Sequence, residues 1–182
     1  AVEGRGKRLV AWPADAATFE TTATISMPEN QSGIQIAGSG ITVRGFEVRK
    51  QGGPDAFGIA TEGPCADIGI ENNLLHALRN TYKSRGGAMR LSNVTGLVVR
   101  GNEVRDNVKC FAYLITKSSD ILFTKNIAKR NGDTAVDFYT NSRVTCTENV
   151  VTDSFGHHAN GLTFYVGNSD VLIERNDVRL SL

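Results

Sequence analysis

The ten residues ITVRGFEVRK begin at Ile41, and the closely similar LVVRGNEVRD begins at Leu97. They share the pattern apolar, any, apolar, any, any, Asn, any, apolar, with Phe46 in the asparagine position of the first copy. The pattern recurs without gaps in four further stretches: IGIENNLL from Ile68, ILFTKNIA from Ile121, VTCTENVV from Val144 and VLIERNDV from Val171. The chain therefore repeats one short unit six times.

The copies start 23 to 29 residues apart, a period typical of repeat architectures. Apolar residues alternate with other residues inside each copy, which indicates strands rather than helices. Each copy thus predicts two short strands joined by an asparagine-bearing bend. A third strand is expected before each copy, in the stretches SGIQIAG, FGIATE, GAMRLSN, AYLITKS, AVDFYTN and GLTFYVG.

Stacking of successive copies would pair each strand in parallel with its equivalent, about 4.8 Å along the axis. Asparagine occupies one fixed offset in five copies, at Asn73, Asn102, Asn126, Asn149 and Asn176. A single asparagine there would be an ordinary turn former. Five at one offset predict a ladder of amides, each bonding the bend backbone and the amide of the next coil.

The x-I-x-I-x-x-N-x-V unit and its aligned asparagines resemble the right-handed parallel β-helix proteins of the pectate-lyase-like superfamily, over residues 33–182. We therefore expect an all-β, single-domain right-handed parallel β-helix of six to seven coils, with three short strands per coil. Residues 1–32 would form a lead-in first coil, and residues 33–182 the repeated coils. A left-handed β-helix is the alternative, but its strict six-residue steps are absent.

The overall composition narrows the choice of partners. The net charge of +1 gives no basic excess for nucleic acid, and the sequence has no apolar run long enough to span a membrane. Three cysteines allow at most one disulfide and have no metal-like spacing. The last repeat shows no polar cap, and open strand edges promote association. We therefore expect further coils of a longer chain, or a partner chain, to cover the C-terminal end.

The connection before the third strand varies most between copies, and variable loops on a rigid scaffold commonly carry binding residues. In the resembled superfamily this face binds a polysaccharide, which implies a secreted or cell-surface protein. Alternation predicts that Ile34, Ile36, Ile59, Met89, Leu91, Tyr113, Ile115, Val136, Phe138, Leu162 and Phe164 point inward. It predicts that Gln35, Ala60, Arg90, Leu114, Asp137, Tyr139, Thr163 and Tyr165 point outward.

Candidate site residues come from two loops and from the strands beside them. The loop RNTYKSRGG supplies Arg79, Tyr82, Lys83 and Arg85. The loop SFGHHANG supplies His157, His158 and Asn160. The strands and bends between or beside these loops supply Arg90, Lys117, Asp133, Asp137, Tyr139 and Tyr165. On consecutive coils these residues would span roughly 15 Å. Such a patch suits an acidic sugar chain.

The preferred chemistry is β-elimination by a polysaccharide lyase, which needs a cation, a base and an acid. Lys83, Arg85 or Arg90 would neutralise the uronate carboxylate. His157, His158 or Lys83 would act as the base. Tyr139 or Tyr165 would donate a proton or stack on a sugar ring. The residues predicted to bind substrate are Arg79, Tyr82, Lys117, Asn160 and Tyr165.

The same residues also have structural interpretations. The basic loop could simply be solvated, the histidines could bond loop backbone, and the tyrosines could form a surface stack. Asp137 could pair with Arg90 or Lys117.

Two other function classes stay open. A glycoside hydrolase would need two carboxylates, with Asp133 and Asp137 the nearest candidates, although no adjacent Asp-Asp pair and no GHG is present. A non-catalytic polysaccharide-binding, adhesin or tail-fibre module is the third class. The resemblance also implies Ca²⁺ in some members, for which Asp133, Asp137 and Asp153 are weak candidate ligands.

Overall fold

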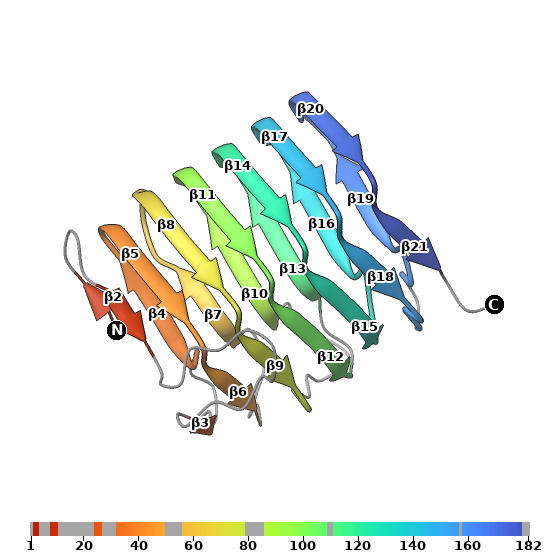
Figure 1. The fold of residues 1–182 in the computed structure, drawn as a ribbon, viewed down its shortest axis with the longest axis horizontal. Helices are drawn as coiled ribbons and strands as arrows, with labels where there is room; N and C mark the ends of the chain where they lie inside the picture. Colours follow the sequence, from red (N-terminus) through yellow and green to blue (C-terminus); the bar gives the residue numbers. More distant parts are fainter. Residues whose placement is uncertain are drawn as a thin grey trace.

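The structure is a computed structural model that describes residues 2–3, 8–10, 24–26, 32–49, 56–78, 86–108, 111–156 and 158–179. These residues form three sheets of seven strands each (Figure 1). Sheet 1 contains β1 (Val2–Glu3), β4 (Ile34–Ala37), β7 (Phe57–Thr61), β10 (Gly87–Ser92), β13 (Phe111–Thr116), β16 (Val136–Tyr139) and β19 (Leu162–Tyr165). Sheet 2 contains β2 (Arg8–Val10), β5 (Ser39–Arg44), β8 (Cys65–Glu71), β11 (Val94–Arg100), β14 (Ser119–Thr124), β17 (Ser142–Thr147) and β20 (Ser169–Glu174). Sheet 3 contains β3 (Thr24–Ser26), β6 (Glu47–Arg49), β9 (Leu74–His76), β12 (Glu103–Asn107), β15 (Ile127–Asn131), β18 (Val150–Thr152) and β21 (Asp177–Arg179).

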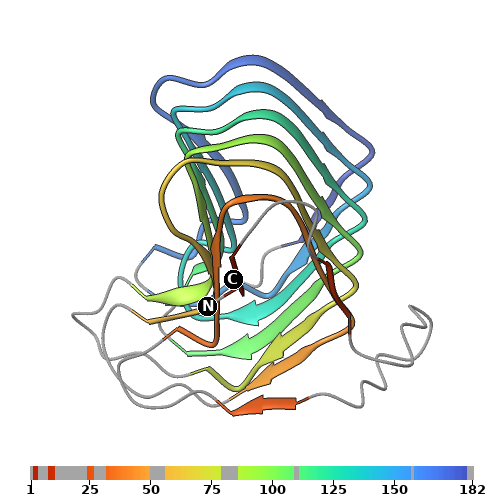
Figure 2. The ribbon, with the colours of Figure 1, turned by 90° about the vertical axis from the view of Figure 1, so that its left-hand side faces the viewer.

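Each coil contributes one strand to each sheet, and the coils lie over one another in the end-on view of Figure 2. Equivalent residues of the repeats pair directly and in parallel. Ile68 of β8, for example, pairs with Ile41 of β5 on one side and with Leu97 of β11 on the other. The predicted all-β parallel β-helix with three strands per coil is therefore confirmed.

The repeated apolar positions fill the interior of the coil. Four aromatic rings of three successive coils contact one another in the order Tyr113, Phe123, Phe138 and Phe164, with centroid separations of 5.0, 5.4 and 4.6 Å. The first two contacts are edge-to-face and the last is stacked. The fully buried Tyr113 hydroxyl donates to the carbonyl oxygen of Asn102 at 3.1 Å. The ring is thus buried without leaving its polar end unpaired.

The predicted asparagine ladder lies at the second bend, between sheets 2 and 3. Asn102 Oδ1 accepts from the backbone N–H and the Nδ2 of Asn73, at 3.0 and 2.9 Å. Asn102 Nδ2 donates to the Ile70 carbonyl at 2.8 Å and to Asn126 Oδ1 at 3.0 Å. The pattern continues through Asn149 to Asn176. The ladder is therefore confirmed.

Shorter polar ladders occupy the other two bends, and the sequence analysis did not predict them. At the first bend, between sheets 1 and 2, the backbone N–H and the Nδ2 of Asn141 donate to Asn168 Oδ1. Asn141 Oδ1 in turn accepts from the Ser118 N–H. At the third bend, after sheet 3, Asn107 Nδ2 donates to Asn131 Oδ1 at 2.8 Å. The equivalent positions of other coils hold Cys65, Val94 and Ser118 at the first bend, and Leu78 and Ser154 at the third, so no single residue type recurs at these offsets.

A left-handed backbone conformation precedes every ladder position of the described second bends. The residues concerned have φ between 53° and 74°: Gly45, Asn72, Gly101, Lys125, Glu148 and Arg175. Two are glycine and one is asparagine, which adopt this conformation readily, whereas it costs Lys125, Glu148 and Arg175 roughly 1–2 kcal/mol each. The bend is therefore strained in these three coils, and the amide hydrogen bonds beside it offset that strain.

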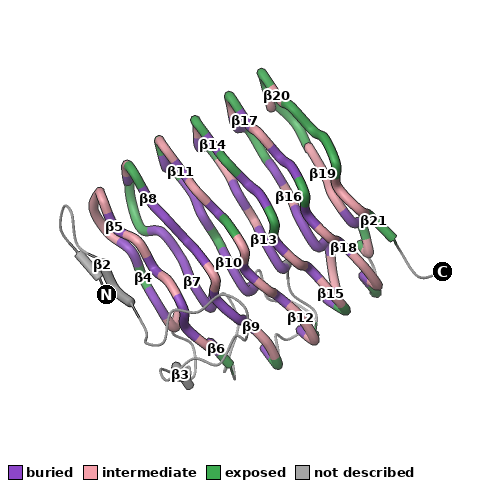
Figure 3. Tube along the Cα trace, viewed as in Figure 1, coloured by how far each residue is buried: buried purple, intermediate pink, exposed green. Residues whose placement is uncertain are grey.

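The last coil, β19 to β21, is the most exposed part of the described repeats (Figure 3). Ile173 and Val178 are 50% and 43% exposed, whereas their partners Cys146 and Val151 are buried. Leu162, Phe164 and Val171 are only partly buried against the core. The covering of this face by a partner or by further coils remains a prediction.

Candidate functional site

The outer face of sheet 1 has the alternation that the sequence predicts. All the predicted inward residues are buried, except Leu162 and Phe164, which are partly buried. The outward residues form two rows across the strands. The first row is Gln35, Ala60, Arg90, Leu114, Asp137 and Thr163, and the second is Ser92, Thr116, Tyr139 and Tyr165. Ala60 is in the outward register but is only 9% exposed, since it lies between the longer Gln35 and Arg90.

Two tyrosines form an exposed aromatic pair on this face. Tyr139 of β16 and Tyr165 of β19 are register partners, and their ring centroids lie 5.5 Å apart at an interplanar angle of 30°. They are 38% and 56% exposed. The two tyrosines therefore form an exposed pair, as one interpretation of the sequence suggested, but with tilted rather than parallel rings.

Asp137 lies in the first row, half-buried between Leu114 and Thr163. Its Oδ1 is buried and has no hydrogen-bond partner among the described residues. Burial raises the pKa of the Asp137 carboxyl, and the charge of Asp133 raises this pKa further. Because Oδ1 is closed to solvent, a ligand can reach this carboxylate only from its partly exposed side.

The expected ion pair of Asp137 with Arg90 or Lys117 is wrong for the described residues. Arg90 belongs to β10, two strands from β16, so in-register stacking separates the two backbone positions by about 10 Å. Lys117 is exposed in the first bend of the intervening coil. The sequence placed these residues on one face correctly, but it could not show that their side chains fail to meet.

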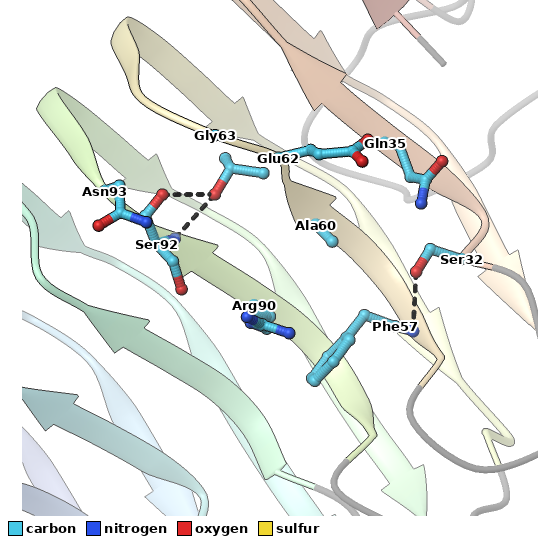
Figure 4. Close-up of a pocket in the computed structure, with 10 residues that line it drawn as sticks. Ser32, Gln35, Phe57, Ala60, Glu62, Gly63, Arg90, Ser92 and Asn93 are labelled. Carbon is cyan, nitrogen blue, oxygen red and sulfur yellow. Dashed lines mark hydrogen bonds between the residues drawn. The ribbon is translucent and has the colours of Figure 1, made fainter.

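Arg90 instead borders a hollow of about 280 Å³ on the outer side of β4, β7 and β10 (Figure 4). Its guanidinium carbon lies 5.7 Å from the centre of the Phe57 ring, a cation–π arrangement. Gln35, Glu62 and Asn93 supply further polar groups to the lining.

The sequence analysis missed the floor of this hollow. Thr61 Oγ1 donates to the Ser92 carbonyl at 2.9 Å and accepts from the Ser92 N–H at 2.7 Å. Ser92 Oγ in turn bonds Thr116 Oγ1 at 2.8 Å. Hydroxyl residues in adjacent copies of the third strand were the available signal. Phe57 gave none, because a lone aromatic at a strand start is ordinary.

His158 and Asn160 lie in the connection before β19, beside the preceding coil. The His158 carbonyl accepts from the Thr134 hydroxyl at 3.0 Å and from the Asn160 N–H at 2.7 Å. The His158 side chain is exposed. Because Asp133 adjoins Thr134, two neighbouring coils gather Asp133, Asp137, His158 and the tyrosine pair at one end of the face.

The rest of the predicted site lies outside the described residues, namely Arg79, Tyr82, Lys83, Arg85 and His157. The described part of the chain has no group of three or more His, Cys, Asp or Glu side chains arranged to hold a metal. Asp133, Asp137 and Asp153 therefore do not form a Ca²⁺ site by themselves.

The two cysteines that the structure describes, Cys65 and Cys146, are free and buried. Burial raises the pKa of the Cys146 thiol to about 12, which keeps it protonated and chemically inert. The coil interior thus supplies no nucleophile from this residue.

Comparison with known proteins gives one match. No curated protein and no solved structure matches the chain. Within the described ranges, no helix has the length and apolar character needed to cross a membrane. The sequence profile described as "Right handed beta helix region" matches residues 12–178. The chain therefore belongs to the right-handed β-helix family.

Proposed function

We propose that this protein binds an extracellular polysaccharide along the outer face of sheet 1. The observation that carries the proposal is the exposed Tyr139–Tyr165 pair, whose rings repeat one coil apart. A tyrosine ring offers an apolar face with a polar end, as a pyranose ring does. The strand spacing of about 4.8 Å is close to the length of one sugar unit, so a chain laid across the strands meets successive row positions.

The charges on the other two sheets favour sheet 1 as the binding face. On sheet 3, Arg105 pairs with Glu103 at 2.7 Å, and His76 meets Glu47 at 2.7 Å. On sheet 2, Glu71 is held by Arg44 and Arg100. On sheet 1, by contrast, neither Arg90 nor Asp137 forms an ion pair within the described chain. Unpaired groups are available to a ligand, and the resemblance to the pectate-lyase-like superfamily points to the same face.

For chemistry we propose β-elimination, the activity of a polysaccharide lyase. Arg90 would neutralise a uronate carboxylate, and a residue of the 79–85 loop, which leads into the same strand, would take the proton. Tyr139 and Tyr165, two and three coils away, would stack on other sugar units of the chain. This assignment rests on residue types and on the resemblance, and it implies a secreted or cell-surface location where such polymers occur.

Glycoside hydrolysis is the second candidate, because one observation favours it. Burial raises the pKa of the Asp137 carboxyl, and the negative charge of Asp133 raises it further. Two carboxyl groups whose environments push their pKa values apart can divide the roles of general acid and base. Hydrolysis would then use Asp137 as the acid and Asp133 as its partner.

A panel of purified uronate-containing and neutral polymers distinguishes these functions. New ultraviolet absorbance from unsaturated sugar ends indicates elimination, whereas reducing ends without that absorbance indicate hydrolysis. Retention of a polymer without either product indicates a non-catalytic binding or tail-fibre module. The binding proposal predicts that at least one polymer is retained by the protein.

A variant pair locates the binding face. Tyr165→Ala should weaken retention at least tenfold, because it removes one ring of the exposed pair. The matched control is Leu172→Ala on sheet 2, which truncates a side chain of similar exposure, 50% against 56% for Tyr165, away from the face. Equal retention by the two variants would place binding elsewhere.

A further inference from the structure

The first outward row of sheet 1 has a regular charge pattern along the axis. It places cationic Arg90, apolar Leu114, acidic Asp137 and neutral Thr163 on four successive coils. A polymer lying along this row meets one position about every 4.8 Å. Its units at Arg90 and at Asp137 are therefore two positions apart.

The two charged positions favour opposite ligand groups. Arg90 is exposed, stacks on Phe57 and forms no ion pair within the described chain, so a carboxylate can approach its guanidinium. Asp137 has the uncharged neighbours Leu114 and Thr163 in register, and the charge that acts on it is the carboxylate of Asp133. A second anion near Asp137 would be repelled.

The Asp137 carboxylate adds a requirement. Its Oδ1 is closed to solvent, so a ligand reaches the group only from its partly exposed side, where an ionised carboxylate accepts hydrogen bonds and needs a donor. A sugar hydroxyl can supply that donor, whereas an ionised carboxylate has only acceptors. The exposed rings of Tyr139 and Tyr165, beside and beyond Asp137, likewise suit the apolar face of an uncharged sugar.

We propose that the ligand of this face is an acidic heteropolysaccharide whose carboxylate-bearing units are separated by at least two neutral units, rather than a polymer with a carboxylate on every unit or on every second unit. The anionic unit lies at Arg90, and a neutral unit donates a hydroxyl to Asp137 two positions away. This inference rests on the polysaccharide-binding function proposed above and specifies its substrate class.

The test is calorimetric titration of the whole chain with three soluble oligosaccharides of matched length. One is a homopolymer of uronate, one alternates a single uronate with two neutral sugars, and one is entirely neutral. The alternating oligosaccharide should bind at least tenfold more tightly than the uronate homopolymer. It should also bind more tightly than the neutral oligosaccharide, because the neutral oligosaccharide has no carboxylate to pair with the Arg90 guanidinium.

Two variants assign this preference to its residues. Asp137→Asn removes the repelling charge, so the homopolymer should gain affinity and the gap to the alternating oligosaccharide should narrow at least threefold. Arg90→Gln should erase the advantage of the alternating over the neutral oligosaccharide. Both substitutions alter outward side chains, and a far-ultraviolet circular dichroism spectrum equal to that of the unaltered protein confirms that each variant is folded.

The outcomes separate the two proposals. Homopolymer binding that equals or exceeds alternating binding in the unaltered protein overturns the inference and leaves the binding function standing. A gap that Asp137→Asn leaves unchanged also overturns it. Failure of all three oligosaccharides to bind overturns the proposed function, and the inference with it.

Discussion

Replacing Asn102 by alanine should strongly destabilise the protein, because this residue lies in the middle of the asparagine ladder. Its side chain makes four ladder hydrogen bonds: Oδ1 accepts two from Asn73, and Nδ2 donates to the Ile70 carbonyl and to Asn126 Oδ1. Asn102 is 0% exposed, so water cannot replace these contacts without opening the coil. The Asn73 backbone N–H in particular loses this partner.

The expected loss follows from these contacts. A typical hydrogen bond contributes about 1 kcal/mol net, and a buried partner left unsatisfied costs about 1–3 kcal/mol. Loss of four bonds should therefore lower the free energy of unfolding by about 4 kcal/mol, a large share of the 5–15 kcal/mol of a typical domain. For a chain of this size the melting temperature should fall by about 10 °C.

Urea unfolding followed by far-ultraviolet circular dichroism measures the change, and Asn176→Ala provides the matched control. Asn176 holds the last ladder position: its Oδ1 accepts from the N–H and the Nδ2 of Asn149, and its Nδ2 donates to the Cys146 carbonyl. It has one ladder bond fewer than Asn102, and its partly buried side chain can be replaced by water from the end of the described coils, so its loss should be smaller, about 2 kcal/mol. Equal losses at the two positions would refute the argument that burial makes the ladder stabilising.

Three other substitutions test separate parts of the structure. Gly58→Ala should destabilise by about 1–3 kcal/mol in urea unfolding, because its Cβ would lie 2.6 Å from Leu75 Cδ2 and 2.7 Å from the Ala88 carbonyl oxygen; an unchanged midpoint would contradict that contact. Thr140→Gly should stabilise by about 1 kcal/mol in the same assay, because Thr140 has φ of 57°, and a loss of stability would argue against backbone strain there. Asp137→Asn should raise the free energy of unfolding at pH 7, because burial raises the pKa of the Asp137 carboxyl in the folded state, so that its ionisation opposes folding. The gain should vanish below about pH 3.9, the pKa of the carboxyl in the unfolded chain. A gain that persisted at lower pH would have another cause.

The fold was predictable because stacking makes one residue choice recur in every coil. Ile68 meets both Ile41 and Leu97 in space, so each must suit the same buried position. The sequence repeat is thus a direct record of three-dimensional pairing. The alternation rule then placed the outward row correctly, down to Asp137 and Tyr165.

The contacts of the site were less predictable, because a repeat fixes the row but not the reach of a side chain. Arg90 stacks on Phe57, a residue of the adjacent coil that no repeat pattern marks. Asp137 has no ion-pair partner in the described structure, since stacking keeps Arg90 two strands away. These features depend on rotamers and on neighbouring side chains, which a periodic pattern does not encode.

The spacing of the ladder positions explains why sheet 1 and the connection before it carry the variable chemistry. The first-bend and second-bend positions are eight residues apart, for example from Val94 to Asn102 and from Asn168 to Asn176. The second-bend and third-bend positions are five residues apart, as from Asn102 to Asn107. The remaining stretch, from the third bend to the next first bend, changes length from one coil to the next. Insertions in the constant stretches would shift the register and turn buried side chains outward. The length of a coil can therefore change only where the chain enters sheet 1, and that is also where loop residues can meet a ligand without disturbing a ladder.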